Sequence, residues 1–342
     1  MQPLPSLPGF PEFDILQQLI ERDRGRHLRV QNLTKINYLG NSLPLPALTL
    51  GRSDHAPAIA FIGGVHGLER IGSQVVLAFL DTLLSRLEWD SLYEDLLQQV
   101  TIHFIPVLNP AGMLAHTRAN GNGVDLMRNA PIDSCEKTVW LAGGHRISPK
   151  LPWYRGIADQ PMETEAQALC DFIRSEVLPA PFSLVLDCHS GFGHHNQIWF
   201  PYAHSRQQAI PNLGEVYYLR QLFFQTYPYQ SYHFEPQSQH YLTHGDLWDY
   251  LYLDALDQNS MFLPLTLEMG SWRWVRKNPR QLFNRLGLYH PIKTHRINRV
   301  LRGHLVLMEF LLHAALSYRK WLDQSLTGRM HQEALELWYA RP

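Results

Sequence analysis

Residues 58–87 read AIAFIGGVHGLERIGSQVVLAFLDTLLSRL and contain two apolar patterns of different period. Residues 58–63 form a short apolar run that ends in glycines, which is typical of a buried strand. Between residues 70 and 87 the apolar positions recur with helical spacing. The segment therefore predicts a strand followed by a helix, with His66 and Glu69 on the connection between them.

The same two patterns recur along the chain. We expect further strands at residues 101–110, 182–188, 195–201 and 262–269, and helices at residues 162–177 and 297–322. Strands that alternate with helices predict an α/β fold, here a single α/β/α domain with a mixed, largely parallel sheet. We place this domain at residues 26–330, between an N-terminal lead-in (residues 1–25) and a C-terminal tail (residues 331–342).

Charge and composition restrict the classes of partner. The 342 residues carry 30 lysines and arginines against 31 acidic residues, which predicts binding to neither nucleic acid nor a membrane surface. Three scattered cysteines favour a reducing compartment. The N-terminal residues lack the pattern of a secretory signal, so we expect a cytoplasmic location. We expect a small peptide or amide as substrate, and the sequence makes no prediction of oligomeric state.

Four chemically suitable side chains fall at or just beyond predicted strand ends, where open parallel sheets bind their ligands: His66, Glu69, His189 and Glu268. A zinc ion used for hydrolysis typically has three His, Asp or Glu ligands and one open position. A histidine and a glutamate three residues apart are a weak signal alone. His189 is a third ligand candidate because it follows an apolar strand, and the rival candidates His194 and His195 lie beyond the next turn.

The loop TRANGNGVDLMRN, residues 117–129, carries further polar candidates. Such loops are often only solvated connections. Two arginines near a zinc site, Arg118 and Arg128, could instead grip a substrate carboxylate, because guanidinium pairs with that group through two hydrogen bonds. Asp125 could accept the free N–H of a ligand histidine and so fix its tautomer.

The order of these motifs resembles the zinc carboxypeptidase family related to carboxypeptidase A, from about residue 58 to residue 270. The resemblance implies one zinc per chain, bound by His66, Glu69 and His189. It implies that Arg118 polarises the scissile carbonyl, that Asp125 pairs with a ligand histidine, and that Glu268 in LTLEMG is the catalytic glutamate. By the same resemblance the substrate-binding residues are Arg128, Asn129, Tyr241 on a mobile loop, and Trp248 in the specificity pocket.

One position departs from the family pattern. Met127 stands where the family usually has an asparagine before the carboxylate-binding arginine, here Arg128. A thioether cannot donate the hydrogen bond that the amide would give to a terminal carboxylate. The zinc chemistry should survive this change, whereas ordinary recognition of a C-terminus is in question.

Taken together, these features predict a zinc-dependent hydrolase that cleaves an amide or peptide bond with Glu268 as general base. Two alternatives remain. The nearer is a deacylase of small N-acyl amino acids, which would release an acyl group rather than an amino acid. The more distant is a non-catalytic binding protein on the same scaffold, which would bind zinc without amidase activity.

Overall fold

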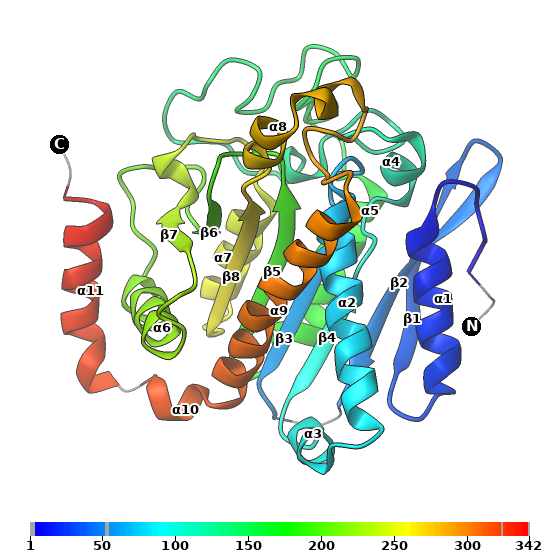
Figure 1. Ribbon diagram of the computed structural model, residues 1–342. Coiled ribbons are helices and arrows are strands. Elements are labelled where there is room, and N and C mark those ends of the chain that lie inside the picture. Colours follow the sequence, from blue (N-terminus) through cyan, green and yellow to red (C-terminus); the bar gives the residue numbers. More distant parts are fainter. Residues whose placement is uncertain (1–3, 52–54, 323, 341–342) are drawn as a thin grey trace.

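A computed structural model describes residues 4–51, 55–322 and 324–340, and its centre is an eight-stranded sheet (Figure 1). The strand order is β1-β2-β4-β3-β5-β8-β6-β7. The pairs β4–β3, β3–β5, β5–β8 and β6–β7 are parallel, and the other three pairs are antiparallel. The strands are β1 Arg29–Tyr38, β2 Asn41–Leu50, β3 Ala58–Gly63, β4 Thr101–Ile105, β5 Ser183–Ser190, β6 Asn196–Phe200, β7 Tyr232–Pro236 and β8 Phe262–Met269.

Helices cover both faces of this sheet, which confirms the predicted α/β fold with a mixed sheet (Figure 1). Helices α1, α2 and α9 lie on one face, and α5 and α7 lie on the other. The helices are α1 Pro11–Asp23, α2 Arg70–Leu87, α3 Ser91–Leu97, α4 Pro110–Ala115, α5 Thr164–Phe172, α6 Leu213–Thr226, α7 Leu247–Asp257, α8 Trp272–Lys277, α9 Thr294–Leu316, α10 Tyr318–Trp321 and α11 Gln324–Trp338. No helix in the described ranges is long and apolar enough to cross a membrane.

The predicted elements differ from the observed ones mainly at their ends. The bounds of β3, α2 and β8 agree with prediction, whereas β4 ends at Ile105, before Asn109, whose side chain caps α4. The helix expected at residues 297–322 begins at Thr294 and is interrupted at Ser317. The hairpin of β1 and β2 was not predicted, since the two prolines in NSLPLPALTL argue against a strand.

Both chain ends contribute helices to the packed domain. Within residues 1–25, α1 lies against α2, and its Phe13 and Leu16 are fully buried. The buried Arg70 of α2 forms an ion pair with Glu12 of α1. Within residues 331–342, α11 packs on α6, and the indole N–H of Trp338 donates a hydrogen bond to the carbonyl of Phe234 at 2.8 Å. The segments expected as lead-in and tail therefore both include packed helices.

Two glycines let the chain turn sharply between β3 and α2. Gly64 has a φ of +70°, a conformation that side chains with a Cβ rarely adopt. A Cβ on Gly67 would lie 2.0 Å from the carbonyl carbon of Gly112, so only glycine allows this close approach. The turn brings His66 and Glu69 over the carboxyl ends of β3 and β5.

Candidate metal centre and catalytic pocket

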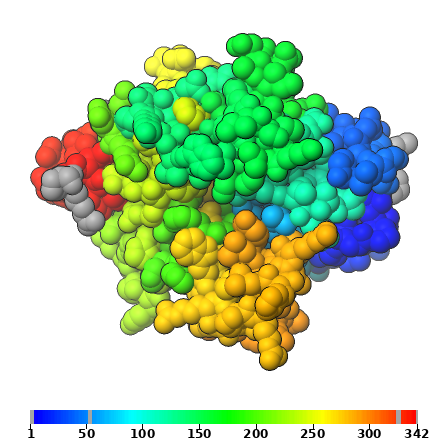
Figure 2. Space-filling model, turned by 90° about the horizontal axis from the view of Figure 1, so that it is seen from above, coloured from blue at the N-terminus to red at the C-terminus, as the bar shows by residue number. Residues whose placement is uncertain are grey.

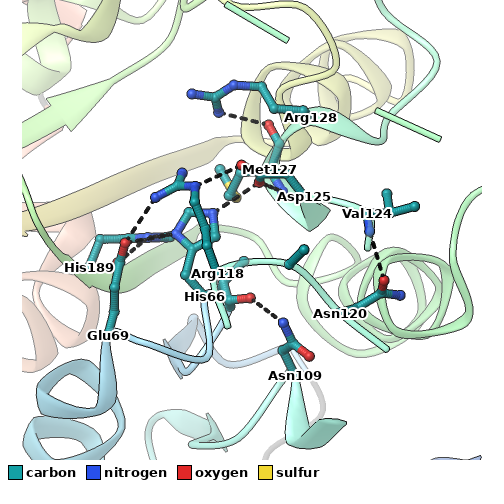
Figure 3. A network of polar contacts seen from close by, with 12 residues as sticks. His66, Glu69, Asn109, Arg118, Asn120, Val124, Asp125, Met127, Arg128 and His189 are labelled. Atoms are coloured by element: carbon teal, nitrogen blue, oxygen red, sulfur yellow. Dashed lines mark hydrogen bonds and ion pairs between the residues drawn. The ribbon is translucent and has the colours of Figure 1, made fainter. Parts of the chain in front are cut away.

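The three predicted metal ligands converge at the carboxyl ends of the central strands (Figure 3). His66 and Glu69 come from the turn before α2, and His189 comes from the end of β5. Their ligand atoms all lie within 4.8 Å of one another, and the three residues are buried. The Nδ1 atoms of the two histidines are 3.2 Å apart, and Glu69 lies 3.0 Å from the first and 3.1 Å from the second.

The far nitrogen of each histidine faces a buried carboxylate. The Nε2 atom of His66 is 3.0 Å from Asp125, as expected from the sequence, and the Nε2 atom of His189 is 2.6 Å from Asp187. With a cation on the Nδ1 side, each carboxylate would accept the Nε2–H of its ring, which leaves both Nδ1 atoms as lone-pair donors. Both rings are therefore held in the tautomer that a metal ligand needs.

This arrangement fits a divalent ion such as zinc. Without a cation between them, the two Nδ1 lone pairs would face each other and the Glu69 carboxylate. Ligand atoms about 2.0–2.1 Å from one tetrahedral ion are roughly 3.3 Å from each other, close to the observed spacings of 3.0 to 3.2 Å. The donor types, two imidazoles and one carboxylate, are those of a zinc site with an open position.

The charges around the cluster also favour a cation. Burial alone would raise the pKa of Glu69, but His66 and His189 hold it well below its usual range. Burial alone would lower the pKa of His189, but Asp187 and Glu69 raise it well above its ordinary value. In the absence of an ion the protein therefore stabilises a proton where a metal would supply positive charge.

Arg118 lies beside the cluster, as predicted. Its Nε donates to Asp125 Oδ2 at 2.8 Å, and its Nη1 donates to Glu69 Oε1 at 3.2 Å. Burial opposes the charge of Arg118, but Asp125 and Glu69 raise its pKa, so it remains a cation. It is one of the residues that line the cavity above the cluster.

Glu268 lies on β8 directly opposite His189 of β5 in the sheet register. Its Oε1 accepts a hydrogen bond from the backbone N–H of Phe192 at 3.0 Å. Burial and the negative charge of Glu69 raise the pKa of Glu268 to about 8. A divalent ion bound by the neighbouring ligands would add positive charge and lower this pKa.

A cavity of about 290 Å³ opens above these residues. Seen from above, the teal and green loops of residues 117–160 lie on one side of this end of the molecule, and the gold and orange segment of residues 270–290 lies on the other (Figure 2). Arg128, Met127 and Tyr241 line the cavity together with His66, Glu69, His189, Arg118 and Glu268. The structure therefore brings together eight side chains that come from separate parts of the sequence.

Contacts with the protein hold the Arg128 side chain in place at the wall of the cavity. Its Nη1 donates to the carbonyl of Met127 at 3.1 Å, and its guanidinium carbon lies 5.8 Å from the centre of the Tyr241 ring. No ion pair joins Arg128 to a carboxylate in the part of the chain that is described. Gly245, with a φ of +70°, permits this packing, since a Cβ there would lie 2.0 Å from the Arg128 carbonyl oxygen.

Two residues expected to bind substrate do not line the cavity. Asn129 donates to the carbonyl of Arg155 at 3.0 Å and accepts the N–H of Glu163 at 2.6 Å, so it joins two loops. The Trp248 indole is buried and donates to Asp187 at 2.8 Å. Because the polar groups of both residues are directed into the protein, the structure does not bring them together with the other expected site residues.

Two residues of the site, Asp187 and Tyr289, were not predicted from the sequence. Asp187 could have been found, since residues two apart on a strand share a face and His189 was already a ligand candidate. Tyr289 lines the cavity from a loop whose sequence carries no signal for it. Gly191 makes room for its ring, because a Cβ there would lie 2.7 Å from it.

Replacing Asp187 with Asn is expected to weaken zinc binding about 10- to 100-fold, the usual effect of losing a carboxylate behind a ligand histidine. Asp187 Oδ2 accepts from both His189 and Trp248, and an amide would place a donor against one of them. Competition with a chelator measures the affinity. Trp248→Phe keeps the carboxylate and should have a smaller effect, and equal zinc affinity in Asp187→Asn and wild type would contradict the role.

An α/β sheet with a His-Glu-His cluster at its strand ends, carboxylates behind both histidines and an open cavity above is typical of a mononuclear metallohydrolase. Residues 24–271 match the family model described as zinc carboxypeptidase. The chain therefore belongs to the zinc carboxypeptidase family, which is zinc-dependent.

Individual relatives match smaller parts of the sequence. Carboxypeptidase SOL1 of Arabidopsis thaliana is 30% identical over 137 residues, which cover 38% of this chain and 28% of that protein. Carboxypeptidase E of Caenorhabditis elegans is 30% identical over 149 residues, which cover 40% of this chain and 30% of that protein. The matched segments thus span less than a third of these relatives.

The fold extends the likeness over most of the chain. The crystal structure of carboxypeptidase A from Helicoverpa armigera superposes with a TM-score of 0.67 and covers 90% of this chain and 73% of that one. The sequence identity is 17%, so the superposition establishes a shared fold.

Proposed function

We propose that this chain is a zinc-dependent peptidase that removes a residue from the free C-terminus of a small peptide. The observation that carries the proposal is the joint placement of the metal cluster, Glu268, Arg118 and Arg128 around one cavity. Membership of the zinc carboxypeptidase family supports it. Among the residues that the structure describes, Arg128 has no ion-pair partner, and a substrate carboxylate would supply one.

Each residue around the metal cluster is given a catalytic role by its position. Zinc held by His66, Glu69 and His189 would supply positive charge that lowers the pKa of a water molecule toward about 7. Glu268 takes the proton of the attacking water on its carboxylate and hands it to the leaving nitrogen. Arg118 donates hydrogen bonds to the carbonyl oxygen as that oxygen gains negative charge.

Substrate binding rests on Arg128 and on the apolar groups around it. A guanidinium offers two parallel N–H donors to a carboxylate. Trp153 and Val139 also line the cavity, and the guanidinium carbon of Arg128 lies 5.8 Å from the centre of the Tyr241 ring. Beside Arg128 the cavity therefore has apolar walls, which suits a terminal residue with an uncharged side chain.

Met127→Asn is expected to strengthen the binding of peptides with a free C-terminus about 10- to 100-fold, with a smaller change in turnover. Met127 lines the cavity next to Arg128, and an amide there could donate one hydrogen bond to the carboxylate, worth about 1.5–3 kcal/mol. Such a contact acts in ground and transition states alike, so KM should fall more than kcat changes. Met127→Leu, which adds no donor, is the matched control.

A panel of free peptides, C-terminally amidated peptides and N-acyl amino acids tests the proposal, with the products identified by mass spectrometry. Hydrolysis of free peptides with release of the last amino acid is the expected result. Release of an acyl group from N-acyl amino acids alone would favour the deacylase, and zinc binding without hydrolysis would favour a non-catalytic binding protein. A cytoplasmic location is part of the proposal and is supported by three unpaired cysteines.

A further inference from the structure

A strongly basic segment follows β8, the strand that carries Glu268. The 40 residues from 269 to 308 contain nine arginines and lysines and no aspartate or glutamate, on a chain whose net charge is −1. The segment includes α8 and about the first two thirds of α9. The charge is thus separated along the sequence, with an excess of acidic residues in the remainder of the chain.

Part of this charge surrounds a cavity of about 470 Å³. The walls are α8, the start of α9 and the loop that precedes β7, and the basic side chains that line it are Arg273, Lys277, His295, Arg296 and Arg299. Within the described ranges no aspartate or glutamate lines the cavity, and none of these five side chains forms an ion pair. The cavity shares none of its described lining residues with the catalytic pocket.

Hydrogen bonds to the protein hold two of the arginines that line the cavity in place. Arg273 donates to Asn196 Oδ1 at 2.8 Å, and Arg296 donates to the carbonyl of Trp274 at 3.1 Å. Each uses one of its five N–H donors in these contacts, so donors remain for a ligand. At the floor, the buried His304 pairs with the Tyr232 hydroxyl at 2.8 Å.

Positive charge accumulates here without compensation. Burial and the charge of Arg299 lower the pKa of Arg273, although Tyr232 acts in the opposite direction. The first turn of α9 has no side-chain cap, so its free N–H groups add partial positive charge next to His295. An anion in the cavity would relieve the repulsion between these groups.

We propose that this cavity binds a small phosphate-bearing molecule at a site separate from the metal centre. Four arginine and lysine side chains from two helices surround one space, which matches a group with two negative charges and three acceptor oxygens better than a planar monocarboxylate. The volume is that of a small-molecule pocket. The site does not depend on the proposed peptidase activity.

The site is close enough to the catalytic strand to share its supporting structure. Arg273 lies five residues after Glu268, and the Asn196 side chain that holds it also accepts the N–H of Gly270 at 3.3 Å. The Trp272 indole donates to the carbonyl of Gly191, in the turn that follows His189, at 2.8 Å. A bound phosphate group would therefore add order to α8 and the turn that it contacts.

Inorganic phosphate is the probe, added to the zinc-loaded protein while chloride keeps the ionic strength constant. Phosphate should raise the melting temperature, and the concentration dependence gives an apparent Kd. Arg299→Glu should raise this Kd at least about tenfold, because it removes one charge-assisted contact and adds a repulsive one. Arg302→Glu makes the same charge change on the exposed part of α9 outside the cavity and should alter the Kd by less than about twofold.

Arg128→Ala removes the cation of the catalytic pocket and should leave phosphate binding intact. The proposal fails if phosphate stabilises the protein no more than chloride does, or if Arg299→Glu and Arg302→Glu weaken binding equally. Loss of binding in Arg128→Ala alone would assign the phosphate to the catalytic pocket instead. A single-stranded oligonucleotide that binds more tightly than phosphate and depends equally on Arg299 and Arg302 would assign the basic segment to nucleic acid.

Discussion

Glu268→Gln should lower kcat at least about 100-fold while zinc content and KM stay close to wild type. The amide keeps the shape of the side chain but cannot take up the proton of water. Oε1 of Glu268 already accepts the Phe192 N–H, and glutamine can retain this contact through its own oxygen, so the fold should be unaffected. Steady-state kinetics on a peptide substrate, with metal analysis of the same sample, measures the effect.

The control for this variant is Glu309→Gln. Glu309 pairs with Arg86 and Tyr93 and does not line the catalytic pocket, so the same chemical change there should leave kcat within about twofold. Near-normal turnover in Glu268→Gln would remove Glu268 from the mechanism. Loss of zinc from Glu268→Gln would instead show that this residue supports metal binding.

His189→Ala should abolish zinc binding at sub-micromolar zinc, with a loss of affinity of at least about 100-fold. The variant removes one of three ligands that together provide most of the binding free energy. The side chain ends a central buried strand, and alanine fits that position without strain, so circular dichroism should still show a folded protein. Zinc content after equilibration against a zinc buffer is the measurement.

His194→Ala is the matched control, because His194 was one of the two rival candidates and lies five residues further along the chain. Its ring lies 5.7 Å from that of Trp272, and it is exposed and outside the metal cluster. This variant should bind zinc as the wild type does. Wild-type zinc content in His189→Ala, or loss of zinc in His194→Ala, would overturn the ligand assignment.

Several features could be predicted because they depend on local sequence. A run of apolar residues that ends in glycine predicts β3, and helical spacing predicts α2, since burial of one face requires these periods. The placement of His66, Glu69, His189 and Glu268 at strand ends followed from these elements together. The resemblance to the zinc carboxypeptidase family added Tyr241, which the structure places in the cavity wall.

The contacts of two expected substrate-binding residues could not be predicted from the sequence. Trp248 and Asp187 are 61 residues apart, and the direction of the indole depends on how α7 packs behind β5 and β8. Asn129 was expected near substrate, yet its amide joins two loops that only the folded chain brings together. In both cases a polar group found a protein partner on folding, because a buried donor without one is costly.

By itself, the sequence determined the α/β class of this protein, the strand ends that carry its ligands and the chemical types of those ligands, because each depends on residues close together in the chain. Only the tertiary structure decided that a second carboxylate, Asp187, holds His189, that Trp248 supports Asp187, and that a basic segment encloses a second cavity. Those features arise where several elements meet, and their geometry depends on the packing of the whole domain.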